Sequence, residues 1–277
     1  MIPAAFDYHR VAFVEHAIQL LSDHPDAKIL AGGHSLLPLM RLRLARPAML
    51  VDIGRIGDLS FIREEGDEIA IGALATHHAV ANSELLQAAC PIVPYAASDI
   101  GDPQVRHVGT IGGSCAHADP ASDMPTVLLA LGASLVARGP SGASRTIPAA
   151  AFFRGLFEPD LASDEVLTEI RVPKTASRGW SYIKFHRRAQ DWALVGVAAV
   201  TGEDGAPAAV ALTNMGDRPL RASGVEAALA DGDDPARAAA RAAEGTSPAS
   251  DAFASAEYRK ELVKVLVRRA LEEAMSG

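Results

Sequence analysis

Cysteine is scarce in this sequence, which carries only Cys90 and Cys115 among its 277 residues. Two cysteines are too few for a disulfide framework, and they show no metal-ligand spacing. An iron–sulfur cluster needs about four thiolates, so this chain cannot hold one and any such cluster must lie on a partner. The scarcity favours a reducing, cytoplasmic setting.

The chain also lacks an excess of basic residues and any long apolar run. Its 26 Lys and Arg are outnumbered by 34 Asp and Glu, giving a formal net charge of -8, which argues against binding nucleic acid by neutralising phosphates. The apolar stretch 125–137 is interrupted by Gly132 and Ser134 and is shorter than the ~20 residues of a membrane-spanning helix. The start lacks the basic and apolar regions of a secretory signal. We expect no nucleic-acid partner, no membrane span and a mature chain that begins at Met1.

Apolar spacing and turn residues predict a mixture of helices and strands. Residues 99–123 are rich in Gly, Asp, His and Pro without a sustained period, and we expect a long functional loop there. The other predicted elements are helices at 14–21, 36–44, 76–83, 125–131, 221–241 and 256–275, strands at 27–30, 49–53, 134–137, 181–185, 195–201 and 208–214, and a hairpin at 62–72.

This pattern indicates the α+β class and two domains. A short polar segment at 173–179 separates the mixed helices and strands before it from three strands and two helices after it. We therefore expect a first domain at 1–176, with subdomains of about 1–55 and 56–176. The second domain, 177–277, should carry its strands in an antiparallel sheet.

Two glycine-rich segments are candidates for holding a phosphate. Residues 31–35 follow a predicted strand and contain Gly32 and Gly33, and residues 109–114 contain Gly112 and Gly113. Neither matches a Rossmann or P-loop fingerprint. Paired glycines nevertheless let backbone N–H groups approach an anion, and donors from two loops would suit the pyrophosphate of FAD. The alternative is that these glycines serve only as turns.

Two acidic residues follow the second of these segments. Asp119 and Asp123 could accept hydrogen bonds from ribose hydroxyls or from a flavin ring. Both could instead cap the loop, and Asp123 stands just before Pro125, where an acidic N-cap is common. Both interpretations remain open at this point.

Short motifs along the whole chain carry a family resemblance. In this order and combination they resemble the FAD-binding medium subunit of molybdenum hydroxylases, particularly the carbon monoxide dehydrogenase-like branch. The motifs are Phe6-Asp7-Tyr8, Ala31–Pro38, Val51-Asp52-Ile53, Ile71-Gly72-Ala73, Asp102–Arg106, Thr110–Ser114 and Ala116–Pro120.

The resemblance implies a fold and a cofactor site. The fold is a two-part FAD-binding domain of the vanillyl-alcohol oxidase type, followed by a C-terminal α+β domain with a three-stranded antiparallel sheet. The two glycine segments would hold the pyrophosphate, Asp123 would lie on the ribose or flavin side, and Leu167 and Lys184 would approach the isoalloxazine. The implied cofactor-binding residues are Ile29, Leu30, Ala31, Gly32, Gly33, His34, Ser35, Leu36, Thr110, Ile111, Gly112, Gly113, Ser114, Asp123, Leu167, Lys184 and Trp192.

The sequence departs from the family pattern at two of these positions. Ser114 stands where relatives often carry Asn, which shortens the reach of the side chain. In Asp191-Trp192, Trp192 stands where relatives often carry Tyr, and it could stack on the flavin or serve as a core or interface aromatic. Lys184 could place a cation beside the reduced flavin, or it could be a solvated lysine at a strand edge.

The function implied is electron relay without substrate chemistry on this chain. Substrate would be oxidised at a molybdenum cofactor on a large partner, and electrons would pass through two [2Fe–2S] clusters on a small partner to non-covalent FAD here. The complex would be a dimer of heterotrimers. The acceptor, whether quinone, NAD or oxygen, and the substrate, whether carbon monoxide, an aldehyde or an N-heterocycle, stay open. No catalytic residue and no metal site are expected on this chain.

Two other functions compete with the relay. A Gly-Gly-His-Ser turn also resembles covalent flavin oxidases, in which His34 would be tethered to FAD, although about 100 residues beyond the FAD domain carry no evident acid–base set. Alternatively, the chain is an assembly subunit that binds no flavin. Flavin release on acid precipitation distinguishes the relay subunit from the covalent oxidase. Visible absorbance of the purified complex distinguishes it from the assembly subunit that binds no flavin.

Overall fold

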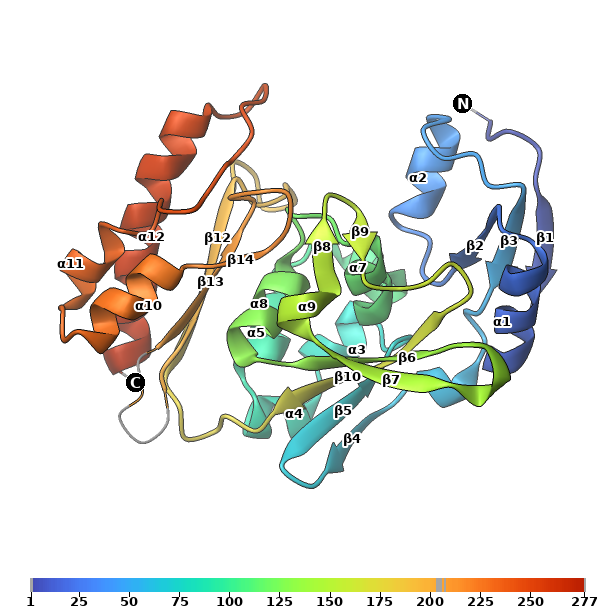
Figure 1. Ribbon diagram of the computed structural model, residues 1–277, viewed down its shortest axis with the longest axis horizontal. Helices are drawn as coiled ribbons and strands as arrows, with labels where there is room; N and C mark the ends of the chain where they lie inside the picture. The colour runs from blue at the N-terminus through green and yellow to red at the C-terminus, as the bar shows by residue number, and fades with distance from the viewer. Residues whose placement is uncertain (1, 203–205, 207, 277) are drawn as a thin grey trace.

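The three larger of the four sheets in the described residues follow one another along the long axis of the molecule (Figure 1). The computed structural model describes residues 2–202, 206 and 208–276. Among them, no helix is both long and apolar enough to cross a membrane. The first sheet belongs to an N-terminal unit, the second to the rest of the first domain, and the third to the C-terminal domain.

The N-terminal unit is a small parallel sheet with two helices. Its strands β1 (Asp7–Arg10), β2 (Ala27–Leu30) and β3 (Met49–Asp52) lie in the order β1-β3-β2, and α1 (Val14–Asp23) packs its apolar face on them. Helix α2 (Leu36–Arg41) is shorter than the predicted 36–44, because Arg43 takes a left-handed backbone with φ of 61°. The turn after β2 therefore lies at the carboxyl edge of the sheet, where open parallel sheets commonly bind ligands.

The second sheet is five-stranded and antiparallel, in the order β4-β5-β10-β6-β7. Helices from the intervening chain pack on it around a core that includes Ile71, Ile111, Leu128 and Ile170. The strands are β4 (Ile62–Glu65), β5 (Glu68–Gly72), β6 (Ser134–Arg138), β7 (Ser144–Pro148) and β10 (Val166–Pro173), and the smaller elements of this region are η1 (Gly57–Leu59), α3 (His77–Ala81), α4 (Glu84–Ala89), α5 (Ile92–Ser98), η2 (Pro140–Gly142), α9 (Ala149–Phe152), β8 (Phe153–Gly155) and β9 (Glu158–Pro159).

The predicted long loop at 99–123 is wrong, because most of it is helical. Helix α6 (Pro103–Val108) starts after Asp102, whose side chain accepts the N–H of Val105, and α7 (Ile111–His117) starts after Thr110, which accepts from Gly113. Both are capping arrangements that override a glycine-rich composition. The helices are only six and seven residues long, too short to show a clear period.

The second pair of glycines, Gly112 and Gly113, lies in helix α7 and not in a turn. A Cβ at Gly112 would lie 2.5 Å from the Cβ of Ala73, so glycine is required for the helix to approach the strand end. Gly113 lies in the first helical turn as well. The next helix, α8 (Asp123–Leu131), is buried along its whole length.

The C-terminal domain packs one sheet between helices of both domains. Strands β11 (Trp180–Phe185), β12 (Val195–Val200) and β13 (Ala209–Thr213) confirm the three predicted strands, and the two-residue β14 (Leu220–Arg221) adds a fourth. On β12, Val195 and Val197 face the C-terminal core, whereas Ala198 and Val200 join the core of the first domain. Because both faces are covered, these strands lack the alternation of a half-exposed sheet.

The helices of this domain differ from the prediction in one place. The predicted helix 221–241 is broken into α10 (Ser223–Ala230) and α11 (Pro235–Ala239), since Gly232 has φ of 90° and Asp234 with Pro235 starts a new helix. Helix α12 (Ala256–Ser276) matches the predicted 256–275 closely and packs on β11 and β12.

Candidate functional site

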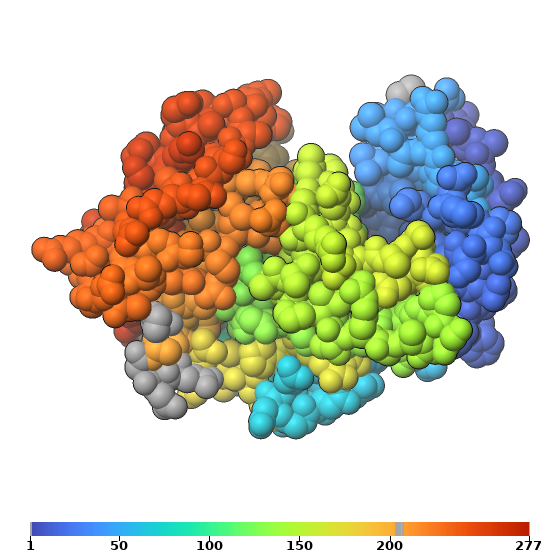
Figure 2. All heavy atoms as spheres, viewed as in Figure 1, coloured from blue at the N-terminus to red at the C-terminus, as the bar shows by residue number. Residues whose placement is uncertain are grey.

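A cavity of about 610 Å³ lies where the N-terminal unit, the five-stranded domain and the C-terminal domain meet. Figure 2 shows the molecular surface hollowed between the blue N-terminal unit and the yellow-green chain near β8 and β9. The volume is that of a site for a sizeable small molecule. Within the described residues, no cluster of His, Cys, Asp or Glu side chains is arranged to hold a metal ion.

The structure brings nearly all the predicted cofactor residues to this cavity. The exception is Ile111, whose side chain is fully buried in the core and whose N–H donates to Ala75 O (3.0 Å). The predicted residues that line the cavity are Ile29, Leu30, Ala31, Gly32, Gly33, His34, Ser35, Leu36, Thr110, Gly112, Gly113, Ser114, Asp123, Leu167, Lys184 and Trp192.

Residues 31–35, the first glycine turn, present free backbone donors to the cavity. Gly33 has φ of 73°, which favours glycine, and a Cβ at Gly32 would lie 2.2 Å from Val108 O. Across the described part of the chain, no acceptor takes the N–H of Gly32, Gly33, His34 or Ser35. A row of unpaired N–H groups on a concave wall has the chemistry needed to bind an anion.

Residues 109–114, the second glycine segment, differ from the expectation. The N–H of Gly112 donates to Ala73 O (2.9 Å), that of Gly113 to Thr110 Oγ1 (3.1 Å), and that of Ser114 to Thr110 O (3.0 Å). These donors are already engaged within the protein. At Gly112, Gly113 and Ser114 this segment offers the cavity the Ser114 side chain and no free backbone N–H. The two glycine segments therefore differ in the donors they can offer a ligand.

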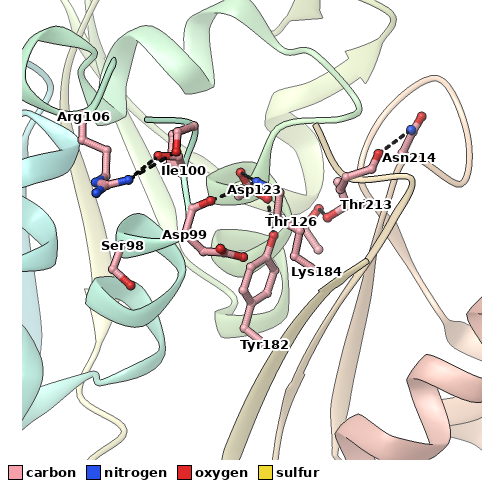
Figure 3. Close-up of polar contacts among 12 residues, drawn as sticks. Ser98, Asp99, Ile100, Arg106, Asp123, Thr126, Tyr182, Lys184, Thr213 and Asn214 are labelled. Atoms are coloured by element: carbon pink, nitrogen blue, oxygen red, sulfur yellow. Dashed lines mark hydrogen bonds and ion pairs between the residues drawn. The ribbon is translucent and has the colours of Figure 1, made fainter. Parts of the chain in front are cut away.

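A buried polar cluster, drawn in Figure 3, includes two residues that line the cavity, Asp123 and Lys184. Asp123, at the start of α8, accepts a hydrogen bond from the Tyr182 hydroxyl through Oδ1, and its Oδ2 pairs with Lys184 Nζ at 3.0 Å. Lys184 Nζ also donates to Asp99 O (3.1 Å). We call Asp123, Tyr182 and Lys184 the Asp123 cluster. It joins α8 of the first domain to β11 of the second.

This geometry excludes the capping alternative for Asp123 and the solvated alternative for Lys184. Asp123 is not the N-cap of α8, a position that Ser122 holds, and its carboxylate instead serves the cluster. Lys184 is not solvated, because its side chain is 2% exposed. Its charge is matched by a carboxylate, so Lys184 is a paired cation beside the cavity.

Burial sets the protonation of the cluster. It raises the pKa of Asp123, an effect that the charge of Lys184 and the hydroxyl of Tyr182 oppose. Burial, followed by the negative charge of Asp123, raises the pKa of Tyr182 well above its usual value. The phenol therefore stays protonated and remains a donor.

Of the remaining candidate residues, Leu167 and Trp192 line the cavity and Asp119 does not. Leu167 on β10 contributes an apolar wall, and Trp192 lies at the cavity with 59% of its surface exposed. The Oδ1 atom of Asp119 accepts the N–H of Ala121 (2.9 Å), so this side chain caps the loop, as the second of the two earlier interpretations has it.

Sequence reasoning missed several lining residues, among them His77, His117 and Phe157. The rings of His117 and Phe157 lie 4.9 Å apart between centroids and are tilted by 35°, a contact between α7 and the chain before β9. His77 meets Gly109 through tertiary packing. His117 lies within the motif 116–120 but was given no role from it, and no local motif signals His77 or Phe157.

The fold and site define a flavoprotein module of the dinucleotide-binding type, and comparisons with known proteins give its family. The family described as the FAD binding domain in molybdopterin dehydrogenase matches residues 4–175. The family described as the CO dehydrogenase flavoprotein C-terminal domain matches residues 180–274. The chain therefore belongs to the FAD-binding subunits of molybdenum hydroxylases.

Relatives match over their full length. The carbon monoxide dehydrogenase medium chain of Afipia carboxidovorans is 42% identical, with 99% of this chain and 98% of the relative covered. The glyceraldehyde dehydrogenase medium chain of Sulfolobus acidocaldarius is 36% identical, with 99% of each covered.

Solved structures agree with the relatives. A chain of carbon monoxide dehydrogenase from Hydrogenophaga pseudoflava is 43% identical with a TM-score of 0.95, covering 100% of this chain and 99% of that one. A chain of quinoline 2-oxidoreductase from Pseudomonas putida 86 is 33% identical with a TM-score of 0.93, with the same coverage.

Replacing Lys184 with Met should destabilise the flavin-free protein by about 3–5 kcal/mol, because it leaves the buried carboxylate of Asp123 without its partner. The double variant Asp123→Asn/Lys184→Met should recover most of that loss, since it removes both charges and an Asn oxygen can still accept from Tyr182. Chemical unfolding of wild type, both single variants and the double variant measures the coupling.

The control is Lys174→Met, which removes a surface pair with Glu64 and should change stability by less than about 1 kcal/mol. A double variant no more stable than Lys184→Met would show that the pairing with Asp123 does not account for the loss.

Proposed function

We propose that this chain holds FAD non-covalently in the cavity and relays electrons within a molybdenum hydroxylase complex. Electrons would come from [2Fe–2S] clusters on a small partner, after substrate oxidation at a molybdenum cofactor on a large partner, and would leave to an external acceptor. The observation that carries the proposal is the row of unpaired N–H groups at Gly32–Ser35, on the wall of a cavity in a chain of this family.

The residues present fit FAD. The pyrophosphate carries two negative charges, and the free N–H groups of the first glycine turn can bind it without a basic side chain. The apolar side chains of Ile29, Leu30 and Leu167 suit the apolar faces of the rings. When bound, FAD supplies one-electron acceptance and two-electron discharge, while the protein supplies binding, orientation and electrostatics.

The chain's own residues would position the flavin rather than act on substrate. Leu167 and Lys184 would lie near the isoalloxazine and Asp123 behind Lys184, so the ring would meet a neutralised ion pair instead of a lone cation. Trp192 would shield the ring at the exposed end of the cavity. Ser114 would add a hydroxyl contact to the pyrophosphate side.

For the whole complex we propose a carbon monoxide dehydrogenase-like enzyme, working in the cytoplasm as a dimer of heterotrimers. The support for the carbon monoxide dehydrogenase-like assignment is the higher identity to a carbon monoxide dehydrogenase medium chain, 42%, than to a glyceraldehyde dehydrogenase medium chain, 36%.

We also propose that the two domains of this chain meet near residue 176, between the segments that the two families match.

Acid precipitation of the purified complex tests the proposal directly. The supernatant should hold FAD, detected by its visible absorption, and the complex should contain molybdenum and iron. A wild-type complex without flavin absorbance would contradict the proposed function. Flavin that stays with the pellet would contradict non-covalent binding and would identify His34 as a covalent anchor.

Gly33→Ala should weaken FAD binding by about tenfold or more. The Cβ disfavours the φ of 73° by about 1–2 kcal/mol, and relief of that strain would turn the N–H groups away from the pyrophosphate. The dissociation constant is measured by titrating the flavin-stripped complex with FAD.

Gly66→Ala is the matched control, because Gly66 has φ of 64° at the tip of the β4–β5 hairpin with open space around it. Both variants carry the same backbone strain, and Gly33→Ala also crowds Leu37 Cδ1 at 2.9 Å, but only Gly33→Ala should lose FAD affinity. Equal affinities in the two variants would show that the first glycine turn does not hold the cofactor.

A further inference from the structure

His77 is a buried polar residue of the cavity wall that the functions described above do not use. It is the first residue of α3, its side chain lines the cavity, and it is 5% exposed. Its Nδ1 atom is buried without any hydrogen-bond partner among the described residues. Buried polar atoms are nearly always paired, so an unpaired one beside a cavity calls for an explanation.

The ring lies next to the first glycine turn. An ideal Cβ on Gly109 would be 3.2 Å from His77 Cδ2 and 3.6 Å from its Nε2, so this edge of the imidazole faces Gly109. An ideal Cβ on Gly32 would in turn be 2.8 Å from the Cα of Gly109. The imidazole, Gly109 and Gly32 therefore form one continuous stretch of wall, beside the free N–H groups.

The surroundings of His77 are positively charged. Arg106 and His34 both oppose a charge on the ring, and Arg106 is held in place by donating to Ile100 O (2.9 Å) and Gly101 O (3.3 Å). Burial, and then these two residues, lower the pKa of His77 to about 4. The imidazole is neutral at physiological pH and carries a single N–H.

The enclosed Nδ1 decides which nitrogen carries that proton. A proton on Nδ1 would be a buried donor without an acceptor, whereas a proton on Nε2 is not enclosed in this way. Nε2–H is therefore the donor. The ring presents it on the edge that faces Gly109 and the cavity.

We propose that His77 is a further FAD-binding residue, which donates a hydrogen bond from Nε2 to the pyrophosphate held by the first glycine turn. The inference rests on the proposed function, since it assigns a side chain to the same site. It gives the cofactor a side-chain donor from α3, on the far side of Gly109 from the backbone donors. It also gives a function to a polar side chain at a buried position that an apolar residue could otherwise fill.

The test is FAD titration of the flavin-stripped complex, with flavin fluorescence as the readout, for wild type, His77→Gln and His77→Leu. A hydrogen bond to a charged group contributes about 1.5–3 kcal/mol, so His77→Leu should weaken FAD binding by roughly 10- to 100-fold. His77→Gln should lose less, because its amide NH₂ can replace the Nε2 donor. The control is His78→Leu, which alters the exposed neighbour that stacks on His107.

Unfolding midpoints with and without FAD separate a binding role from a structural one. If His77 binds the cofactor, saturating FAD should raise the midpoint of His77→Gln and of wild type more than that of His77→Leu. His77→Leu that binds FAD within about twofold of wild type, whatever its stability, would overturn the inference and leave the proposed function standing. A wild-type complex that binds no FAD would overturn both.

Discussion

The approach of Gly32 to residues 108–109 is the contact on which the site depends. A side chain at position 32 would collide with Val108 O, so the N-terminal unit can dock on the rest of the first domain only with glycine there. That docking places the first glycine turn at the carboxyl edge of the parallel sheet and against the end of α6. The cavity and its row of unpaired N–H groups follow from this one close contact.

The Asp123 cluster fixes the opposite wall. It ties α8 to β11, so the C-terminal domain cannot shift without exposing or separating a buried ion pair. Breaking a buried pair is costly, although such pairs add little net stability over apolar packing. The cluster therefore specifies the relative position of the domains, and with it the position of Lys184 and Leu167 at the cavity. Sheet β11–β14, packed on both faces, makes the same junction rigid.

The sequence predicts the elements with strong apolar patterns and misses those that depend on caps or tertiary contacts. Strand 27–30 followed by Gly-Gly marks the first glycine turn, and the strands and last helix of the C-terminal domain are equally clear. Helices α6 and α7 are missed because they are only six and seven residues long, and only Asp102 and Thr110 signal their starts. A prediction from composition alone therefore assigns a loop where the structure has two helices.

The same difference between local patterns and tertiary contacts applies to the site. The residues that the family resemblance named line the cavity, except Ile111, but it did not name His77, His117 or Phe157, and it did not give the chemistry of the residues it named. That the N–H of Gly112 is paired with Ala73 O, or that Lys184 is buried against Asp123, depends on residues far away in sequence. His77 belongs to the same class, since its partner surface is Gly109.

An experimental density map of the assembled complex, at a resolution that separates the phosphates, tests the central claim most directly. The account predicts FAD in the cavity with pyrophosphate oxygens about 2.7–3.2 Å from backbone nitrogens of Gly32–Ser35. A pyrophosphate that contacts only other parts of the chain, with the N–H groups of the first glycine turn facing solvent, would contradict it.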